Sequence, residues 1–159
     1  MQDEPKLPTR TFAIAPVPRL TALALSLGLA AAMVTAPAAA ETAAIAGKWK
    51  TDEATSIILI APCTPGAATE CGWINRFLVP EPAGGARDDK NPDRALRSRK
   101  LLGVAILTGL KSDGRQWTGR GYSPKEGRNF NARIRIENGK LNLRGCVSII
   151  CRTVVWTRA

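Results

Sequence analysis

The feature that most constrains the fold is a two-residue alternation of side chains on either side of an Asn-Gly pair. Between residues 130 and 144, apolar side chains at every second position alternate with polar or basic ones, and only Asn138-Gly139 interrupts the pattern. A period of two is that of a β-strand with one buried face. Asn-Gly accommodates the positive φ angles of a two-residue hairpin turn. The sequence therefore predicts two antiparallel strands, at 130–137 and 140–146, with an apolar face and a basic face.

Further strand signals recur at a regular spacing, with turn residues such as Asp113-Gly114 and Glu126-Gly127 between them. They cover residues 45–51, 55–62, 72–79, 103–110, 116–122 and 151–157. About eight antiparallel strands can close into a small up-and-down β-barrel, which leaves no sheet edge exposed. The predicted fold class is thus all-β, with a barrel as the first interpretation and a two-sheet sandwich as the alternative.

One stretch, residues 80–100, does not follow the strand pattern. Its first part is rich in proline and glycine, which is typical of a flexible connection. Asn91 is a good N-cap, the next residue is a proline suited to the first helical position, and Asp93 favours a helix N-terminus. We therefore expect one short helix at 92–97 within a long loop. The acidic residues here do not have the spacing of a calcium loop, so we interpret them as capping and turn residues.

The first 40 residues have the features of a secretory signal peptide. Lys6, Arg10 and Arg19 precede an uncharged stretch at 20–40, which ends in three alanines. This pattern predicts cleavage before Glu41, export to the periplasm or beyond, and a single mature domain at 41–159. Retention of the segment as a membrane anchor is the alternative.

The chain has no histidine, which restricts the chemistry available to it. Ser–His–Asp and Cys–His catalysis and histidine-ligated metals are excluded. The carboxylates lie at turns and in the 80–100 segment, and their spacing places no pair for acid–base work. We therefore expect no enzymatic activity, no cofactor and no metal.

The four cysteines form two local pairs, Cys63 with Cys71 and Cys146 with Cys151. Four cysteines allow three disulfide connectivities, and in an exported chain the two local closures are the simplest. Zinc bound by all four cysteines is an alternative, but Cys63 and Cys71 are further apart than the two to four residues usual between zinc ligands. Free thiols are the remaining alternative.

A net charge of +10 is most often a sign of nucleic-acid binding. Here, export and the distribution of arginines along alternating strand faces indicate a solvated exterior instead. We expect no nucleic-acid partner, and an anionic amphiphile or an anionic component of the cell envelope fits the charge better.

Several motifs in a fixed order resemble the bacterial exported family called domain of unknown function 2147. The resemblance covers essentially all of the predicted mature chain and departs at residues 147–150, which are mostly apolar and contain no glycine, where a tight turn would favour one. The motifs are Gly47-Lys-Trp49-Lys-Thr51, Cys71-Gly-Trp-Ile, Asp89-Lys-Asn-Pro-Asp93, Leu96-Arg-Ser-Arg99, Trp117-Thr-Gly, Tyr122-Ser-Pro-Lys-Glu-Gly127 and the ending from Arg144 to Arg158.

The resemblance implies a calycin-like β-barrel, related in shape to lipocalins, and no assigned activity. In lipocalins a Gly-x-Trp on the first strand closes one end of the barrel, and a late arginine packs on the indole. Gly47 and Trp49 match the first part, and Arg158 or Arg152 is expected to supply the arginine. We interpret Trp49 as a structural plug rather than a ligand contact.

Two hypotheses of function follow, and they differ in whether the barrel interior is open. In the first, the protein is a binding module for a small apolar or anionic amphiphilic ligand. In the second, it is an envelope surface protein with a solid core, acting through its basic face and the 80–100 loop, where Arg94, Arg97, Arg99 and Lys100 lie. The candidate lining residues of the first hypothesis are Trp117, Phe130, Ile134, Ile136, Leu143 and Trp156.

Overall fold

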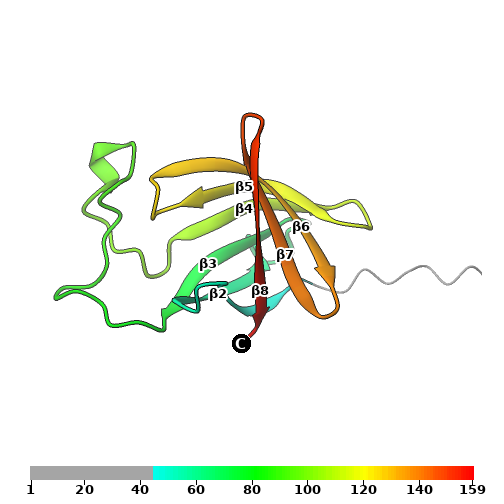
Figure 1. Ribbon diagram of the computed structural model, residues 1–159, viewed down its shortest axis with the longest axis horizontal. Coiled ribbons are helices and arrows are strands. Elements are labelled where there is room, and N and C mark those ends of the chain that lie inside the picture. Colours follow the sequence, from blue (N-terminus) through cyan, green and yellow to red (C-terminus); the bar gives the residue numbers. More distant parts are fainter. Residues whose placement is uncertain (1–44) are drawn as a thin grey trace, which may run out of the picture. The chain divides into compact units, whose positions relative to one another are not determined.

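Residues 45–159, which the computed structural model describes, form a closed antiparallel β-barrel of eight strands (Figure 1). Each strand pairs with the next along the chain, and β8 pairs with β1. The predicted barrel is therefore confirmed, and the sandwich alternative is wrong. The predicted signal peptide and cleavage site lie outside the described residues. The strands are β1 (Gly47–Lys50), β2 (Ser56–Pro62), β3 (Glu70–Phe77), β4 (Ala105–Ser112), β5 (Trp117–Ser123), β6 (Arg128–Glu137), β7 (Lys140–Val147) and β8 (Ile150–Arg158).

The hairpin of β6 and β7 has the predicted turn and register. Glu137 pairs with Lys140 across the turn, and Asn138 and Gly139 have φ angles of 52° and 71°. From residue 130 to residue 137, exposed polar side chains alternate with buried or half-buried apolar ones. The alternation in sequence thus corresponds to the inner and outer faces of the barrel wall.

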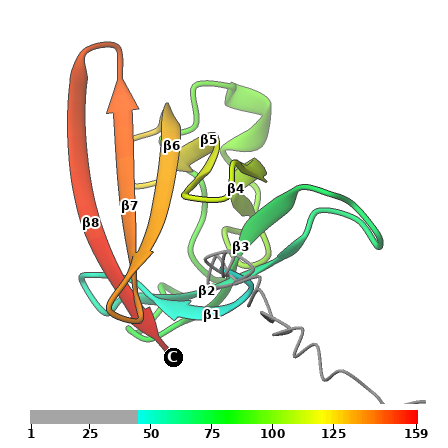
Figure 2. The same ribbon diagram turned by 90° about the vertical axis from the view of Figure 1, so that its right-hand side faces the viewer.

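The seam that closes the barrel is short. β1 pairs with β8 only through Trp49 with Arg158 and Lys50 with Thr157. Beyond this seam, the first part of β8 has β7 as its paired neighbour, and the β7–β8 hairpin extends past the end of β1 (Figure 2). The barrel is consequently tight at one end and splayed at the other.

The long connection from β3 to β4 contains less helix than expected. In place of a helix at 92–97, there is a single 3₁₀ turn, η1 (Arg94–Leu96), and its N-cap is Asp93 rather than Asn91. The carboxylate of Asp93 accepts a hydrogen bond from the amide of Ala95 at 2.9 Å. Asn91 is buried, and its side chain bonds within the loop, so that it is not the N-cap.

Two disulfides join the predicted local pairs, Cys63–Cys71 and Cys146–Cys151. The second links β7 to β8 next to a tight turn in which Ser148 has a φ angle of 52°. The turn thus forms without the glycine that the family pattern led us to expect. No helix among residues 45–159 has the length and apolar character needed to cross a membrane.

Candidate functional site

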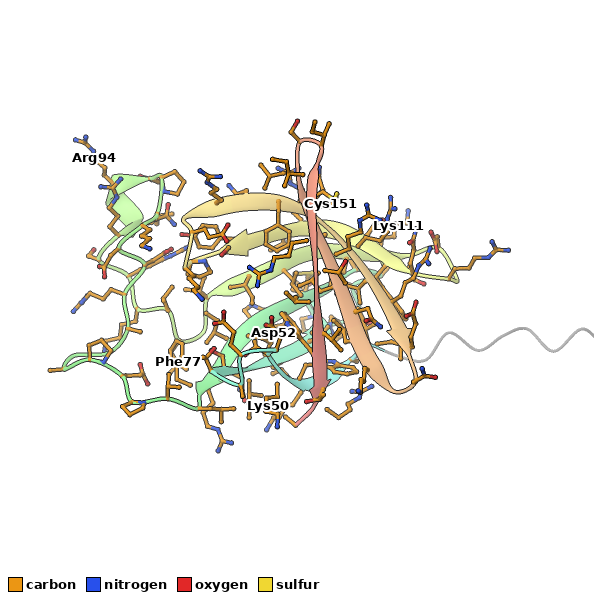
Figure 3. All side chains as sticks on the ribbon, viewed as in Figure 1. Lys50, Asp52, Phe77, Arg94, Lys111 and Cys151 are labelled. Carbon is orange, nitrogen blue, oxygen red and sulfur yellow. A yellow bond between two sulfur atoms is a disulfide. The ribbon has the colours of Figure 1, made fainter. Side chains whose placement is uncertain are left out.

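A cavity of about 780 Å³ opens at the splayed end of the barrel. Its wall is formed by inward-facing side chains of the strands, and its rim by the connections β1–β2, β3–β4 and β5–β6 and the β7–β8 hairpin. In Figure 3, Asp52 and Phe77 lie at this end, and Lys111 lies toward the opposite one. The apolar lining residues are Ile58, Ile74, Phe77, Leu101, Ile106, Leu107, Phe130, Leu143, Val147, Ile150, Val154 and Trp156.

The opposite end is closed by Trp49, which is completely buried. Its indole N–H donates to the carbonyl of Ile45 at 2.7 Å, and the guanidinium of Arg158 stacks on its ring, 3.9 Å from the centroid. Arg158 also donates to the carbonyl of Ala46 at 2.7 Å. A Cβ on Gly47 would lie 2.5 Å from Nη1 of Arg158, and the φ angle of Gly47 is 125°, so a larger residue here would be strained and would displace the guanidinium.

The structure therefore places Arg158, and not Arg152, on the indole of Trp49. Arg152 lies at the other end of β8, where it lines the cavity. Trp49 itself is not among the lining residues of the cavity. The physical role of Gly47, Trp49 and Arg158 is thus to close and pack one end of the barrel.

Of the six predicted lining residues, the structure brings three to the cavity: Phe130, Leu143 and Trp156. The other three lie in the packed half of the barrel. Trp117 and Ile134 are buried there, and Ile136 packs against the same core cluster. Strand alternation predicts that all six point inward, but it does not indicate how far along the barrel each one lies.

On β8, sequence reasoning found Trp156 but missed the other lining residues, although the alternation of the strand indicates them. Counting back from the buried Trp156 in steps of two reaches Val154, Arg152 and Ile150, and all three line the cavity. The strand therefore presents apolar side chains deep in the cavity and a guanidinium near its mouth.

Phe130 has space for its ring because glycines face it from both neighbouring strands. A Cβ on Gly121 of β5 would overlap the ring, and one on Gly145 of β7 would lie 3.0 Å from Cδ2. Gly145 also lines the cavity. The ring thus covers backbone that would otherwise be bare, and it forms part of the apolar wall.

The rim of the cavity is charged and cross-linked. Nζ of Lys125 pairs with Oε1 of Glu53 at 2.7 Å, which links the β5–β6 and β1–β2 connections. Nζ of Lys90 donates to the carbonyl of Lys125 at 2.9 Å, and a Cβ on Gly127 would overlap the carbonyl of Lys90. The hydrogen bond and charge of Lys125 lower the pKa of Glu53. The charged rim residues are Arg87, Lys90, Lys125, Arg128 and Arg152 on the basic side and Asp52, Glu53, Asp89 and Glu126 on the acidic side.

A buried carboxylate, Asp88, anchors the β3–β4 connection to the barrel. It accepts hydrogen bonds from Arg99 at 2.7 and 2.9 Å, from Asn91 at 2.7 Å and from the hydroxyl of Tyr122 on β5. Burial raises the pKa of Asp88, but these hydrogen bonds and the charge of Arg99 outweigh it, so the pKa lies below its usual value. Burial and the bond to Asp88 raise the pKa of Tyr122 to about 12.

This network changes how the predicted basic cluster is interpreted. Arg99 is bound to Asp88, and Nε of Arg97 donates to the carbonyl of Asn91 at 2.8 Å. Two of the four basic residues of the cluster therefore hold the loop together. Arg94 and Lys100 are exposed to solvent.

The barrel, plugged by Trp49 at one end and hollow at the other, is a lipocalin-like fold. Protein HP1028 from Helicobacter pylori, described as belonging to the lipocalin family, superposes with a TM-score of 0.64 at 19% sequence identity, over 73% of this chain and 83% of that one. At this identity the similarity concerns the fold alone. A family model described as "Uncharacterized protein conserved in bacteria (DUF2147)" matches residues 47–158, and the chain belongs to this family. Comparison with the curated proteins gives no match.

Proposed function

We propose that this protein is an exported, non-catalytic carrier that binds a small apolar or anionic amphiphilic ligand in the barrel cavity. The observation that carries the proposal is the cavity of about 780 Å³, which is apolar inside and charged at the rim. Cavities of a few hundred to about 1,000 Å³ with mainly apolar walls and few polar groups are typical of small-molecule sites.

The arrangement along β8 supports an amphiphile over a purely apolar compound. An apolar chain would lie against Trp156, Val154 and Leu143, and its headgroup would reach Arg152 and Arg128 at the rim. Neither arginine takes part in the ion pairs found among residues 45–159. A carboxylate, sulfate or phosphate headgroup would therefore find cationic partners there.

The acidic residues support a role without catalysis. At the rim, Glu53 is paired with Lys125, and its pKa is lowered rather than raised. Burial raises the pKa of Glu70, but this residue is not among those that line the cavity. A general acid poised near neutral pH inside the cavity is thus not part of the proposal.

The open half of the barrel supports the carrier over the alternative of a surface protein with a solid core. The basic outer face is compatible with both. Export rests on the N-terminal sequence pattern, and intact-mass analysis of the secreted protein tests it, since retention of residues 1–40 would contradict cleavage.

The carrier proposal is tested by filling the cavity from β8. Val154→Phe adds a ring to the cavity wall, and Val155→Phe, on the outer face of the same strand, is the matched control. After expression in a lipid-rich host, native mass spectrometry is expected to show a bound ligand on the wild type and on Val155→Phe, and a loss of at least tenfold in the bound fraction on Val154→Phe. Circular dichroism and urea unfolding verify that both variants fold.

The charge of the headgroup is tested with a fluorescent fatty acid as the probe. Arg152→Gln is expected to weaken binding about tenfold, because a charge-assisted hydrogen bond contributes about 1.5–3 kcal/mol. Arg144→Gln, on the outer face of β7, is the control and is expected to bind as the wild type does. Equal binding by wild type and Val154→Phe, or no bound ligand or probe in any preparation, would contradict the carrier function.

A further inference from the structure

The turn of the β7–β8 hairpin carries an exposed apolar tip, formed by Val147, Ile149 and Ile150. Their exposed fractions are 44%, 93% and 77%. The turn stands clear of the rest of the barrel, at the top in Figure 1 and again in the rotated view of Figure 2. Single exposed apolar residues are common, but three gathered at one protruding turn are typical of an interaction site.

The tip is held in shape by covalent and hydrogen bonds. Val147 and Ile150 are register partners, and the Cys146–Cys151 disulfide links the adjacent pair (Figure 3, where Cys151 is labelled). A cross-linked two-residue turn has little conformational freedom to lose when it is buried by a partner. The tip is therefore ready to insert without prior folding.

The surface below the tip is basic. Arg144 of β7 and Arg133 of β6 are register partners on the outer face, and Arg152, which lines the mouth of the cavity, follows the disulfide on β8. None of the three takes part in the ion pairs found among residues 45–159. At about 3.3 Å per residue, Arg144 and Arg152 lie roughly 7–10 Å from the nearest tip residue along their strands. An apolar group at the boundary between headgroups and acyl chains is buried by about 5–10 Å. With the tip at that depth, both arginines would lie at the level of the lipid headgroups.

We infer that the tip docks on an anionic lipid bilayer, with Val147, Ile149 and Ile150 in the interfacial region and the flanking arginines among the headgroups. Val147 and Ile150 also line the cavity, so that the mouth opens where the tip meets the lipid. An amphiphile then passes between bilayer and cavity along an apolar edge. This transfer step rests on the proposed carrier function, whereas docking itself does not.

Area and charge favour a bilayer over a second copy of the chain. A stable protein–protein interface buries on the order of 1,200 Å² or more, and three side chains at one turn offer far less. Two copies joined at this turn would also bring Arg144 and Arg152 of each toward those of the other. An anionic membrane supplies negative charge for these arginines, and its lipids adapt to a small apolar protrusion, so that it needs no large contact area.

Flotation of the exported protein with lipid vesicles tests the docking. Vesicles of phosphatidylglycerol and phosphatidylcholine are expected to carry the wild type, and Ile149→Asp is expected to reduce the floated fraction at least tenfold. Val155→Asp is the matched control, since Val155 is an exposed apolar residue of β8, five residues beyond Ile150 of the tip. It is expected to float within twofold of the wild type.

Charge is tested in the same assay. Arg144→Gln is expected to weaken flotation severalfold, whereas Arg115→Gln, at the β4–β5 turn at the closed end, is expected to have no effect. Vesicles of phosphatidylcholine alone, or a rise from about 0.1 to about 0.5 M salt, are expected to release the protein.

The docking inference and the proposed carrier function are contradicted by different results. If Ile149→Asp floats as the wild type does, if neutral vesicles bind equally well, or if sedimentation without lipid shows a dimer that Ile149→Asp dissociates, the docking inference is overturned. None of these results affects the ligand carried by the cavity, which native mass spectrometry of Val154→Phe examines.

Discussion

Asp88 shows how one side chain positions a long connection. It is fully buried, and its two oxygens bind residues from the β3–β4 connection and from β5. Because a buried carboxylate is stable only when it is hydrogen-bonded, the loop is held in the one conformation that satisfies it. That conformation also brings Arg87, Asp89 and Lys90 to the rim of the cavity. Asp88 thus shapes the mouth without lining it.

Asp88→Asn is expected to lower the free energy of unfolding by about 2 kcal/mol at pH 7, because the charged bonds to Arg99 are lost. The adjacent, exposed Asp89→Asn is the control and is expected to change it by less than about 0.5 kcal/mol. Urea unfolding monitored by tryptophan fluorescence measures both.

The lowered pKa of Asp88 predicts that the effect of this substitution on folding stability depends on pH. The pKa of Asp88 is lower in the folded chain than in the unfolded one, where it is about 3.9. The carboxylate therefore stabilises the fold above that pH, and this stabilisation is lost as the pH falls through the lower, folded-state pKa. The difference between wild type and Asp88→Asn is expected to be smaller at pH 2 than at pH 5. A difference that is the same at both pH values would contradict this role.

At the scale of elements, the β7–β8 hairpin shows that a local covalent link can replace a favourable turn residue. Ser148 adopts a positive φ, which is disfavoured for a residue with a Cβ, and there is no glycine in the turn. Seven paired positions and the disulfide hold the two strands together on either side of it. The turn therefore follows from the strands it joins rather than from its own composition.

Removal of this disulfide by Cys146→Ser with Cys151→Ser is expected to lower the free energy of unfolding by about 2 kcal/mol, the loop entropy of a short closure. Cys63→Ser with Cys71→Ser, at the packed end, is the matched control for stability and is expected to have a cost of similar size. Only the first pair is expected to weaken vesicle flotation, because only it lies at the tip. If both pairs weaken flotation equally, the effect arises from global stability and not from the hairpin.

For the whole molecule, the important property is the difference between the two ends of the barrel. The packed end contains Trp49 beneath Arg158, with the seam between β1 and β8, while the other end contains the cavity. The first half of β8 is paired on one side only, with β7, because β1 reaches only the end of β8. The proposed carrier function would be served by a rigid end and an adaptable end, since the fold would have to persist while the mouth admits a ligand.

Hydrogen–deuterium exchange is expected to show this difference directly. Peptides from β6, which pairs with both β5 and β7, should exchange slowly, and peptides covering residues 150–155, paired with β7, should exchange at least tenfold faster. A bound amphiphile is expected to slow the second group and leave the first unchanged. Equal protection of the two groups in the free protein would contradict an adaptable mouth.

The features of the fold that depend on short-range geometry could be predicted from the sequence. Alternation at 130–137 indicates which side chains face inward, Asn138-Gly139 indicates a turn, and the spacing of the cysteines indicates local disulfides. Each depends on residues a few positions apart, whose relative placement is set by the strand or turn itself. The helix predicted at 92–97 was too long, because Asn91 bonds Asp88 instead of capping a helix.

The amino-acid sequence by itself indicated the inner and outer faces of the strands, and it favoured a barrel over a sandwich and two local disulfides over zinc or free thiols; the structure confirms these preferences. Only the tertiary structure decided how far along the barrel each inward side chain lies, and thus that Phe130 lines the cavity while Ile134 is in the packed core. It also decided that Arg158 rather than Arg152 covers Trp49, and that Lys125 meets Glu53 across the mouth. These placements depend on the register and tilt of strands distant in the chain, which closing the barrel sets for all strands together.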